Sequence, residues 1–123
     1  MTDLVVTLPK TVRWSDYQRE LDAVADGSAV MNFRLPAMPK GVGAGDRCYL
    51  AYNGRVVGWM EVVGVLRREA FTCETTHVHW PAGVYLQRSG PFHFLDEYVA
   101  QKGFQGFRYA PSGWRDVPER PHA

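Results

Sequence analysis

The 123-residue sequence has few cysteines, no long apolar run and almost no net charge, and each shortage excludes a class of protein. Its two cysteines, Cys48 and Cys73, are too few for the disulfide framework of a small secreted domain and form no CxxC pair. No apolar stretch reaches the roughly 20 residues of a membrane-spanning helix, and the N-terminus lacks the basic and apolar regions of a signal peptide. We therefore expect a cytoplasmic protein with two reduced thiols.

The near balance of charge limits how this chain can bind nucleic acid or an anionic membrane. Lys and Arg number 14 against 13 Asp and Glu, which gives a formal net charge of +1. Bulk electrostatic attraction is therefore weak, and a nucleic-acid site must depend on a local group of basic side chains. The fractions of apolar residues, 46%, and of charged residues, 22%, are ordinary for a folded protein, so we expect a single domain.

The N-terminal part predicts one strand followed by one helix. Residues 4–8 form a short apolar run that ends at Pro9, which is typical of a strand. A helix is expected to begin near Ser15, because Ser15 and Gln18 have the spacing of a capping box, and to end at Gly27. Apolar residues recur between them at helical spacing and predict one buried face.

A β-hairpin is the clearest local signal in the chain. Asn53-Gly54 readily adopts the positive φ angles of a type I′ turn, and apolar arms lie on both sides of it. With a regular two-residue turn, Trp59 pairs with Cys48 and shares a face with Cys48 and Leu50. Two glycines in the long second arm favour a bent strand, as in the wall of a barrel.

The other elements are predicted with weaker signals. Residues 28–35 and 84–88 predict strands, and the Pro- and Gly-rich residues 36–45 predict a loop. Near the C-terminus we expect a short helix at residues 95–102 and a last strand at residues 104–109.

Two short motifs flank the hairpin. Gly45-Asp46 comes just before its first arm, and Gly58 to Val62 reads G-x-x-E-V in its second arm. Together with the element order across residues 4–109, they resemble the PUA-like superfamily, especially its EVE and ASCH branches. The resemblance implies an α+β fold, a small antiparallel β-barrel with one or two flanking helices, over residues 1–110. Residues 111–123, with three prolines and mixed charge, are expected to form a loosely held tail.

The resemblance also implies a function. Members of these families commonly bind RNA or DNA and often recognise a modified or extruded base, so we expect a non-catalytic nucleic-acid-binding module. Some ASCH proteins are small amidohydrolases that act on modified nucleosides, which leaves an enzyme as one alternative, using Lys40 with Glu61 or Asp46. The ASCH pattern places a lysine and a glutamate before the Gly-Asp strand, and here only Lys40 is present. Another alternative is a barrel whose cleft binds a small polar or cationic molecule.

Four residues are candidates for binding the nucleic acid. Asn32 and Arg34 lie on one face of the predicted second strand, where an amide can read a base edge and a guanidinium can bind phosphate. Trp59 and Trp80 offer indole rings on which a base can stack. We predict that these four side chains approach one cleft. For each of them the ordinary alternative is a core aromatic or a solvated polar side chain.

Arginine is far more frequent than lysine, 11 residues against 3, which favours planar contacts with phosphate. The adjacent Arg67 and Arg68, at a predicted strand end, are candidate phosphate-binding residues.

Metal and cofactor sites are not predicted. Cys73, His77, His79 and His93 match no common zinc spacing, so we expect no metal site. The glycine-rich residues 41–45 lack the lysine and the following helix of a phosphate-binding loop, and no cofactor motif is present.

Overall fold

The computed structural model describes residues 2–73 and 76–121. The elements, in chain order, are β1 (Leu4–Thr7), α1 (Trp14–Val24), β2 (Met31–Leu35), β3 (Arg47–Tyr52), β4 (Arg55–Arg68), β5 (Phe71–Thr72), β6 (His79–Trp80), β7 (Gly83–Phe94), β8 (Phe107–Tyr109) and a 3-10 helix at Ser112–Asp116.

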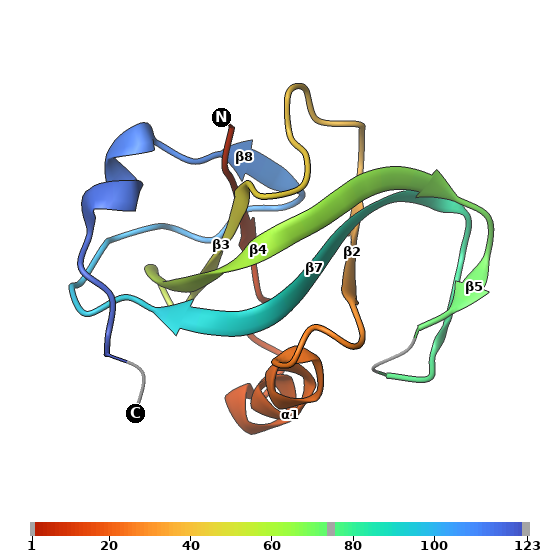
Figure 1. The fold of residues 1–123 in the computed structure, drawn as a ribbon, viewed down its shortest axis with the longest axis horizontal. Coiled ribbons are helices and arrows are strands. Elements are labelled where there is room, and N and C mark those ends of the chain that lie inside the picture. The colour runs from red at the N-terminus through yellow and green to blue at the C-terminus, as the bar shows by residue number, and fades with distance from the viewer. Residues whose placement is uncertain (1, 74–75, 122–123) are drawn as a thin grey trace.

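Six strands form a sheet that curls into a half-barrel, in the order β2-β7-β4-β3-β1-β8 (Figure 1). The pair β1 and β3 is parallel, whereas the other neighbours are antiparallel. The predicted α+β class is confirmed in this form, as a mostly-sheet fold with one described α-helix. The short strands β5 and β6 form a separate two-stranded ribbon between β4 and β7.

The predicted hairpin forms, but its register differs from the regular one. Asn53 and Gly54 both have positive φ angles, 51° and 79°, and occupy the two turn positions. A β-bulge in the hairpin then adds one residue to β4, so that Trp59 pairs with Tyr49. The predicted pairing of Trp59 with Cys48 is wrong, because one extra residue moves each later side chain of the arm to the other face.

The helix α1 covers one side of the curled sheet. Its predicted apolar stripe is buried against the main core through Tyr17, Leu21 and Val24. The helix begins at Trp14, without the predicted side-chain cap from Ser15, and the backbone carbonyl of Arg13 accepts the first helical hydrogen bonds instead.

The chain after β7 covers the other side of the sheet, where a second core forms. Buried residues of β1, β3 and β4 pack there with Leu95 and with aromatic side chains from the C-terminal segment, which lies at the left of Figure 1. The helix predicted over residues 95–102 is wrong. Its backbone is irregular, with isolated bridges at Leu95 and Ala100. It bonds to the hairpin instead, with Val99 O accepting from Val56 N–H and Gln101 N–H donating to Gly54 O.

Two further differences concern strand lengths. The predicted strand at residues 84–88 is the first half of β7, which continues through Ser89-Gly90-Pro91 where the sequence favours a turn. Gly90 has a φ of +85° and the pairing with β4 shifts register there, so the turn residues form a bulge inside a long strand. The last strand is confirmed only at Phe107–Tyr109.

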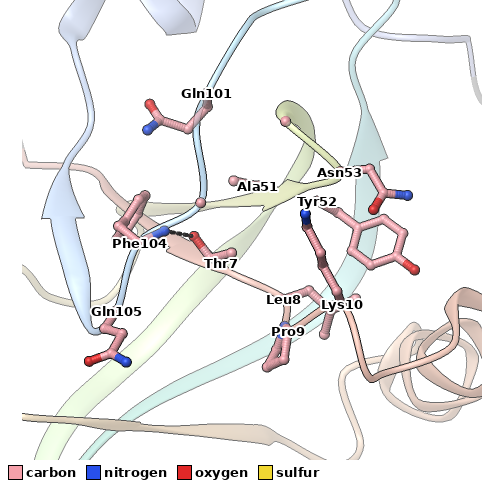
Figure 2. Close-up of a pocket in the computed structure, with 12 residues that line it drawn as sticks. Thr7, Leu8, Pro9, Lys10, Ala51, Tyr52, Asn53, Gln101, Phe104 and Gln105 are labelled. Carbon is pink, nitrogen blue, oxygen red and sulfur yellow. Dashed lines mark hydrogen bonds between the residues drawn. The ribbon is translucent and has the colours of Figure 1, made fainter.

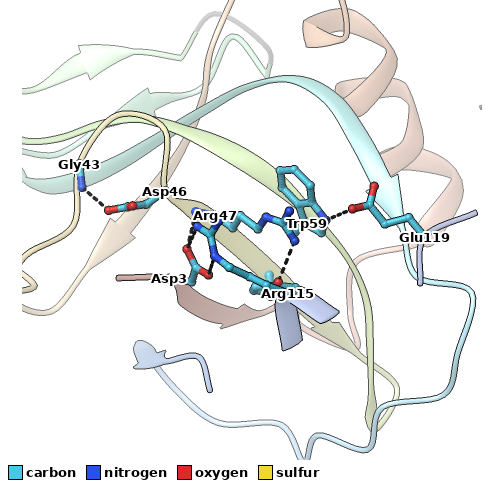
Figure 3. A network of polar contacts seen from close by, with 8 residues as sticks. Asp3, Gly43, Asp46, Arg47, Trp59, Arg115 and Glu119 are labelled. Atoms are coloured by element: carbon cyan, nitrogen blue, oxygen red, sulfur yellow. Dashed lines mark hydrogen bonds and ion pairs between the residues drawn. The ribbon is translucent and has the colours of Figure 1, made fainter. Parts of the chain in front are cut away.

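The described residues after 110, numbers 111–121, make specific contacts with the rest of the fold. Trp114 packs edge-on against Tyr49, with ring centroids 5.2 Å apart. The guanidinium of Arg115 holds the buried carboxylate of Asp3 through two hydrogen bonds of 2.7 Å, seen in Figure 3. Within the described chain no helix has the length and apolar character needed to cross a membrane.

Candidate functional site

Three adjoining hollows extend from the β3–β4 turn to the region between the edge strand β2 and the chain just before the other edge strand, β8. The first, of about 540 Å³, lies between β2 and the chain at Gln105. The second, of about 310 Å³, shares Gln105 with the first and lies between the end of β1 and residues 101–105 (Figure 2). The third, of about 320 Å³, shares Tyr52 and Asn53 with the second. We call the three hollows together the groove.

Basic side chains line every part of the groove. Arg34 lies in the first hollow, Lys10 in the second, and Arg55 and Arg120 in the third. None of the described lining residues is acidic, and none of these four cations forms an ion pair with a described carboxylate. Uncompensated cations along a concave surface concentrate a positive potential there, although the chain as a whole is nearly neutral.

Aromatic rings line the groove together with these cations. In the third hollow Trp14 packs at a tilt on Tyr52, with centroids 5.6 Å apart, and against the edge of Phe94 at 6.1 Å. The hydroxyl of Tyr52 donates a hydrogen bond to the carbonyl of Val12 at 3.2 Å, which fixes the ring that separates two hollows. Phe104 supplies a further ring to the second hollow, as Figure 2 shows.

The groove depends on glycine at one close approach. Gly106 has a φ of +76°, and a Cβ added there would lie 3.1 Å from the ring of Pro36. A side chain at this position would therefore be strained and would push residues 105–106 away from β2. The first hollow keeps its present width because the two chain segments can come this close.

Three of the four predicted nucleic-acid-binding residues, together with Arg68, lie on the outer face of β2, β7 and β4 or on the β5–β6 ribbon that packs there. Neighbouring residues of these strands face the main core, so alternation places Asn32 and Arg34 on the opposite face. We call the set that packs there the outer-face cluster: Asn32, Arg68, Phe71, Trp80, Tyr85 and Gln87. Arg34 pairs across from Tyr85, so it stands between this cluster and the groove.

Trp59 lies apart from the other predicted residues and is already stacked. The guanidinium of Arg47 lies 3.9 Å from its ring centroid (Figure 3). The ring of His93 stacks on it at 4.0 Å. Arg47 comes from β3 and His93 from β7, the neighbours of β4 on either side, so both ring faces are covered. The indole N–H donates to Glu119 at 3.3 Å. Trp59 therefore helps to hold the C-terminal segment.

The remaining predicted residues are scattered. Arg67 is exposed, on the face of β4 opposite to Arg68. The carboxylate of Asp46 accepts a hydrogen bond from Gly43 N–H at 3.0 Å, and Lys40 contributes its backbone N–H to the hydroxyl of Tyr109. Within the described chain, no hydrogen bond or ion pair joins the Lys40 side chain to Asp46 or Glu61.

Sequence reasoning missed most of the groove. Lys10, Arg55 and Arg120 come from three separate parts of the chain, and each is an isolated basic residue in its local sequence. The one available signal was Arg55 directly after the Asn-Gly turn. Comparisons of the chain with protein-family models, with curated proteins and with solved structures gave no match.

Proposed function

We propose that this protein is a non-catalytic module that binds single-stranded nucleic acid along the groove. The observation that carries the proposal is the lining: four basic side chains, five aromatic ones and no described acidic one over three adjoining hollows. Proteins that bind single strands combine such a cationic track with rings on which bases stack.

The composition of the lining also bears on the main alternative, a barrel that binds a small polar or cationic molecule, and it argues against the cationic form. A small cationic ligand would meet four like charges and no described carboxylate, so the groove disfavours it. A duplex presents its bases stacked and hidden, so it gains little from rings that lie in hollows, whereas a single strand can place bases against them. RNA and DNA both satisfy this chemistry.

The finer assignment to the PUA-like superfamily belongs to the same proposal. The half-barrel, together with Gly45-Asp46 before β3 and the Gly58 to Val62 motif in β4, supports it. Recognition of a modified or extruded base is the specificity that this assignment adds. Gln105 and Asn53, each shared by two hollows, are the amides best placed to read a base edge.

The test is a titration of a fluorescein-labelled single-stranded oligonucleotide followed by fluorescence anisotropy at several salt concentrations. Each phosphate contact contributes about −0.7 to the slope of log K against log salt for a single strand, so four contacts give a slope of about −3. Arg55→Gln removes one of the four cations. We expect weaker binding and a slope that is shallower by about 0.7.

Arg19→Gln is the matched control, because it makes the same charge change on the exposed face of α1, outside the groove. It should leave both the affinity and the slope near their wild-type values. Equal weakening by the two substitutions would mean that only overall charge matters. Absence of binding at low salt by the folded wild-type protein would reject the proposal.

A further inference from the structure

The outer-face cluster contains an amide whose orientation is determined by its neighbours. Asn32 Oδ1 accepts hydrogen bonds from Arg68 Nη1 at 3.1 Å and from Gln87 Nε2 at 3.3 Å. The opposite orientation would set the Asn32 amino group against two donors, so these contacts assign the oxygen and the nitrogen. Asn32 is only 8% exposed, and its Nδ2 is buried without a hydrogen-bond partner.

A second unpartnered donor lies in the same cluster. Trp80 Nε1 is also buried without an acceptor. Only one other buried side-chain nitrogen or oxygen of the described chain lacks a partner, Arg88 Nε, and Arg88 bonds to Tyr17 in the core. Buried N–H groups without acceptors are rare in proteins, so two in one cluster call for acceptors from outside the chain, either ordered water or a bound ligand.

The cluster is positively charged as well as rich in hydrogen-bond donors. The guanidinium of Arg68 lies 3.6 Å from the ring centroid of Phe71 and forms no ion pair with a described carboxylate. A ligand that fits here must bring several acceptors and a negative charge. A tetrahedral oxyanion meets both conditions.

The cluster is open on one side. Gly64 of β4 pairs with Gln87, and a Cβ added at Gly64 would meet no atom within 4 Å. Arg68 and Trp80 are themselves only half-buried. Because both donor atoms are buried, a small anion that approaches from the side of Gly64 reaches them when the half-buried side chain of Arg68 or Trp80 moves aside.

We propose that the outer-face cluster binds a phosphate group, with Arg68 as its charge partner and with Asn32 Nδ2 and Trp80 Nε1 as hydrogen-bond donors. The group can be free phosphate or a phosphodiester of a nucleic acid. This site uses different residues from the groove, and it stands whether or not the groove binds a single strand.

The test follows the ¹⁵N-labelled full chain by NMR during titration with inorganic phosphate at constant ionic strength. The indole N–H of Trp80 and the side-chain amide of Asn32 should shift and saturate together, while the indoles of Trp59 and Trp114 stay in place. Asn32→Asp keeps acceptors for Arg68 and Gln87 but removes the N–H donors and adds a like charge to the ligand. It should weaken phosphate binding at least tenfold.

Asn53→Asp is the matched control, because it places the same change in the groove. It should leave the phosphate titration unchanged and weaken only oligonucleotide binding, so the two sites can fail separately. Should Asn32→Asp not fold, Trp80→Phe removes the indole N–H and keeps a ring, and the Asn32 amide then reports a loss of affinity of severalfold or more.

The results decide the proposal in the following way. A folded wild-type chain that shows no saturable shift with phosphate overturns it, as does a folded Asn32→Asp or Trp80→Phe variant that binds phosphate with unchanged affinity. A shift of Trp80 with an oligonucleotide as well as with phosphate identifies the source as a phosphodiester. A shift with inorganic phosphate alone identifies free phosphate.

Discussion

Replacing Gly58 by alanine should destabilise the fold strongly, because the sheet leaves no room for a side chain there. An added Cβ would lie 2.3 Å from the carbonyl oxygen of His93 and 2.5 Å from the ring of Phe92. The carbonyl belongs to the backbone of β7, so β4 and β7 must separate to relieve the overlap. Overpacking a core costs roughly 1–3 kcal/mol and occasionally more, and a clash with backbone places this substitution at about 3 kcal/mol.

Urea unfolding followed by tryptophan fluorescence measures this cost. Thermal unfolding gives a second measure of the same cost: at roughly 3–5 °C for each kcal/mol in a domain of this size, the melting temperature should fall by about 10 °C or more. Gly64→Ala is the control in the same strand, because its Cβ meets nothing within 4 Å and its φ is not positive. It should be neutral or stabilise by up to about 1 kcal/mol. Equal stability of the two variants would refute the steric reasoning.

Two further predictions concern stability. Burial alone would raise the pKa of Asp3, but hydrogen bonds from Arg115 and from the backbone of Arg47 outweigh it and hold that pKa below the ordinary 3.8. The stability from this ionised carboxylate is therefore present above pH 3.8 and is lost as the pH falls through the lowered pKa. We expect the Asp3→Asn variant to lose less stability below pH 4 than the wild type, as measured by urea unfolding. Tyr17→Phe removes the hydroxyl that accepts a hydrogen bond from the buried Arg88 at 3.1 Å, and it should lower the free energy of unfolding by about 1–3 kcal/mol. A variant as stable as the wild type would show that this hydrogen bond contributes nothing.

The hairpin shows which part of the fold the sequence could predict. Asn53-Gly54 determines its turn from two adjacent residues, and this local signal gives the correct turn position. The bulge has no comparable local signal, since it forms in a strand that pairs with β3 on one side and with β7 on the other. The face of Trp59 therefore follows from the packing of three strands and could not be derived from the turn alone.

The C-terminal half shows a second limit. Residues 95–102 have a pattern compatible with a helix, but their backbone bonds to Gly54 and Val56, some 40 residues earlier in the chain. Helix propensity is a weak preference, and a sheet that offers unpaired backbone groups and an apolar face overrides it. Local sequence patterns also did not indicate the second core, built around Val5 and Tyr49, because it forms from segments far apart in the chain.

The two candidate sites differ in how the sequence encodes them. Asn32 and Arg34 stand two residues apart, and their common face follows directly from strand geometry. Arg68 reaches Asn32 only because β7 lies between β2 and β4, and Trp80 joins them because the β5–β6 ribbon folds back onto Tyr85. Spacing along the chain thus reveals residues that share one strand, whereas a cationic groove or a phosphate site assembled from several strands requires the topology. A near-neutral chain can for this reason hold a local concentration of positive charge in the groove that its composition does not indicate.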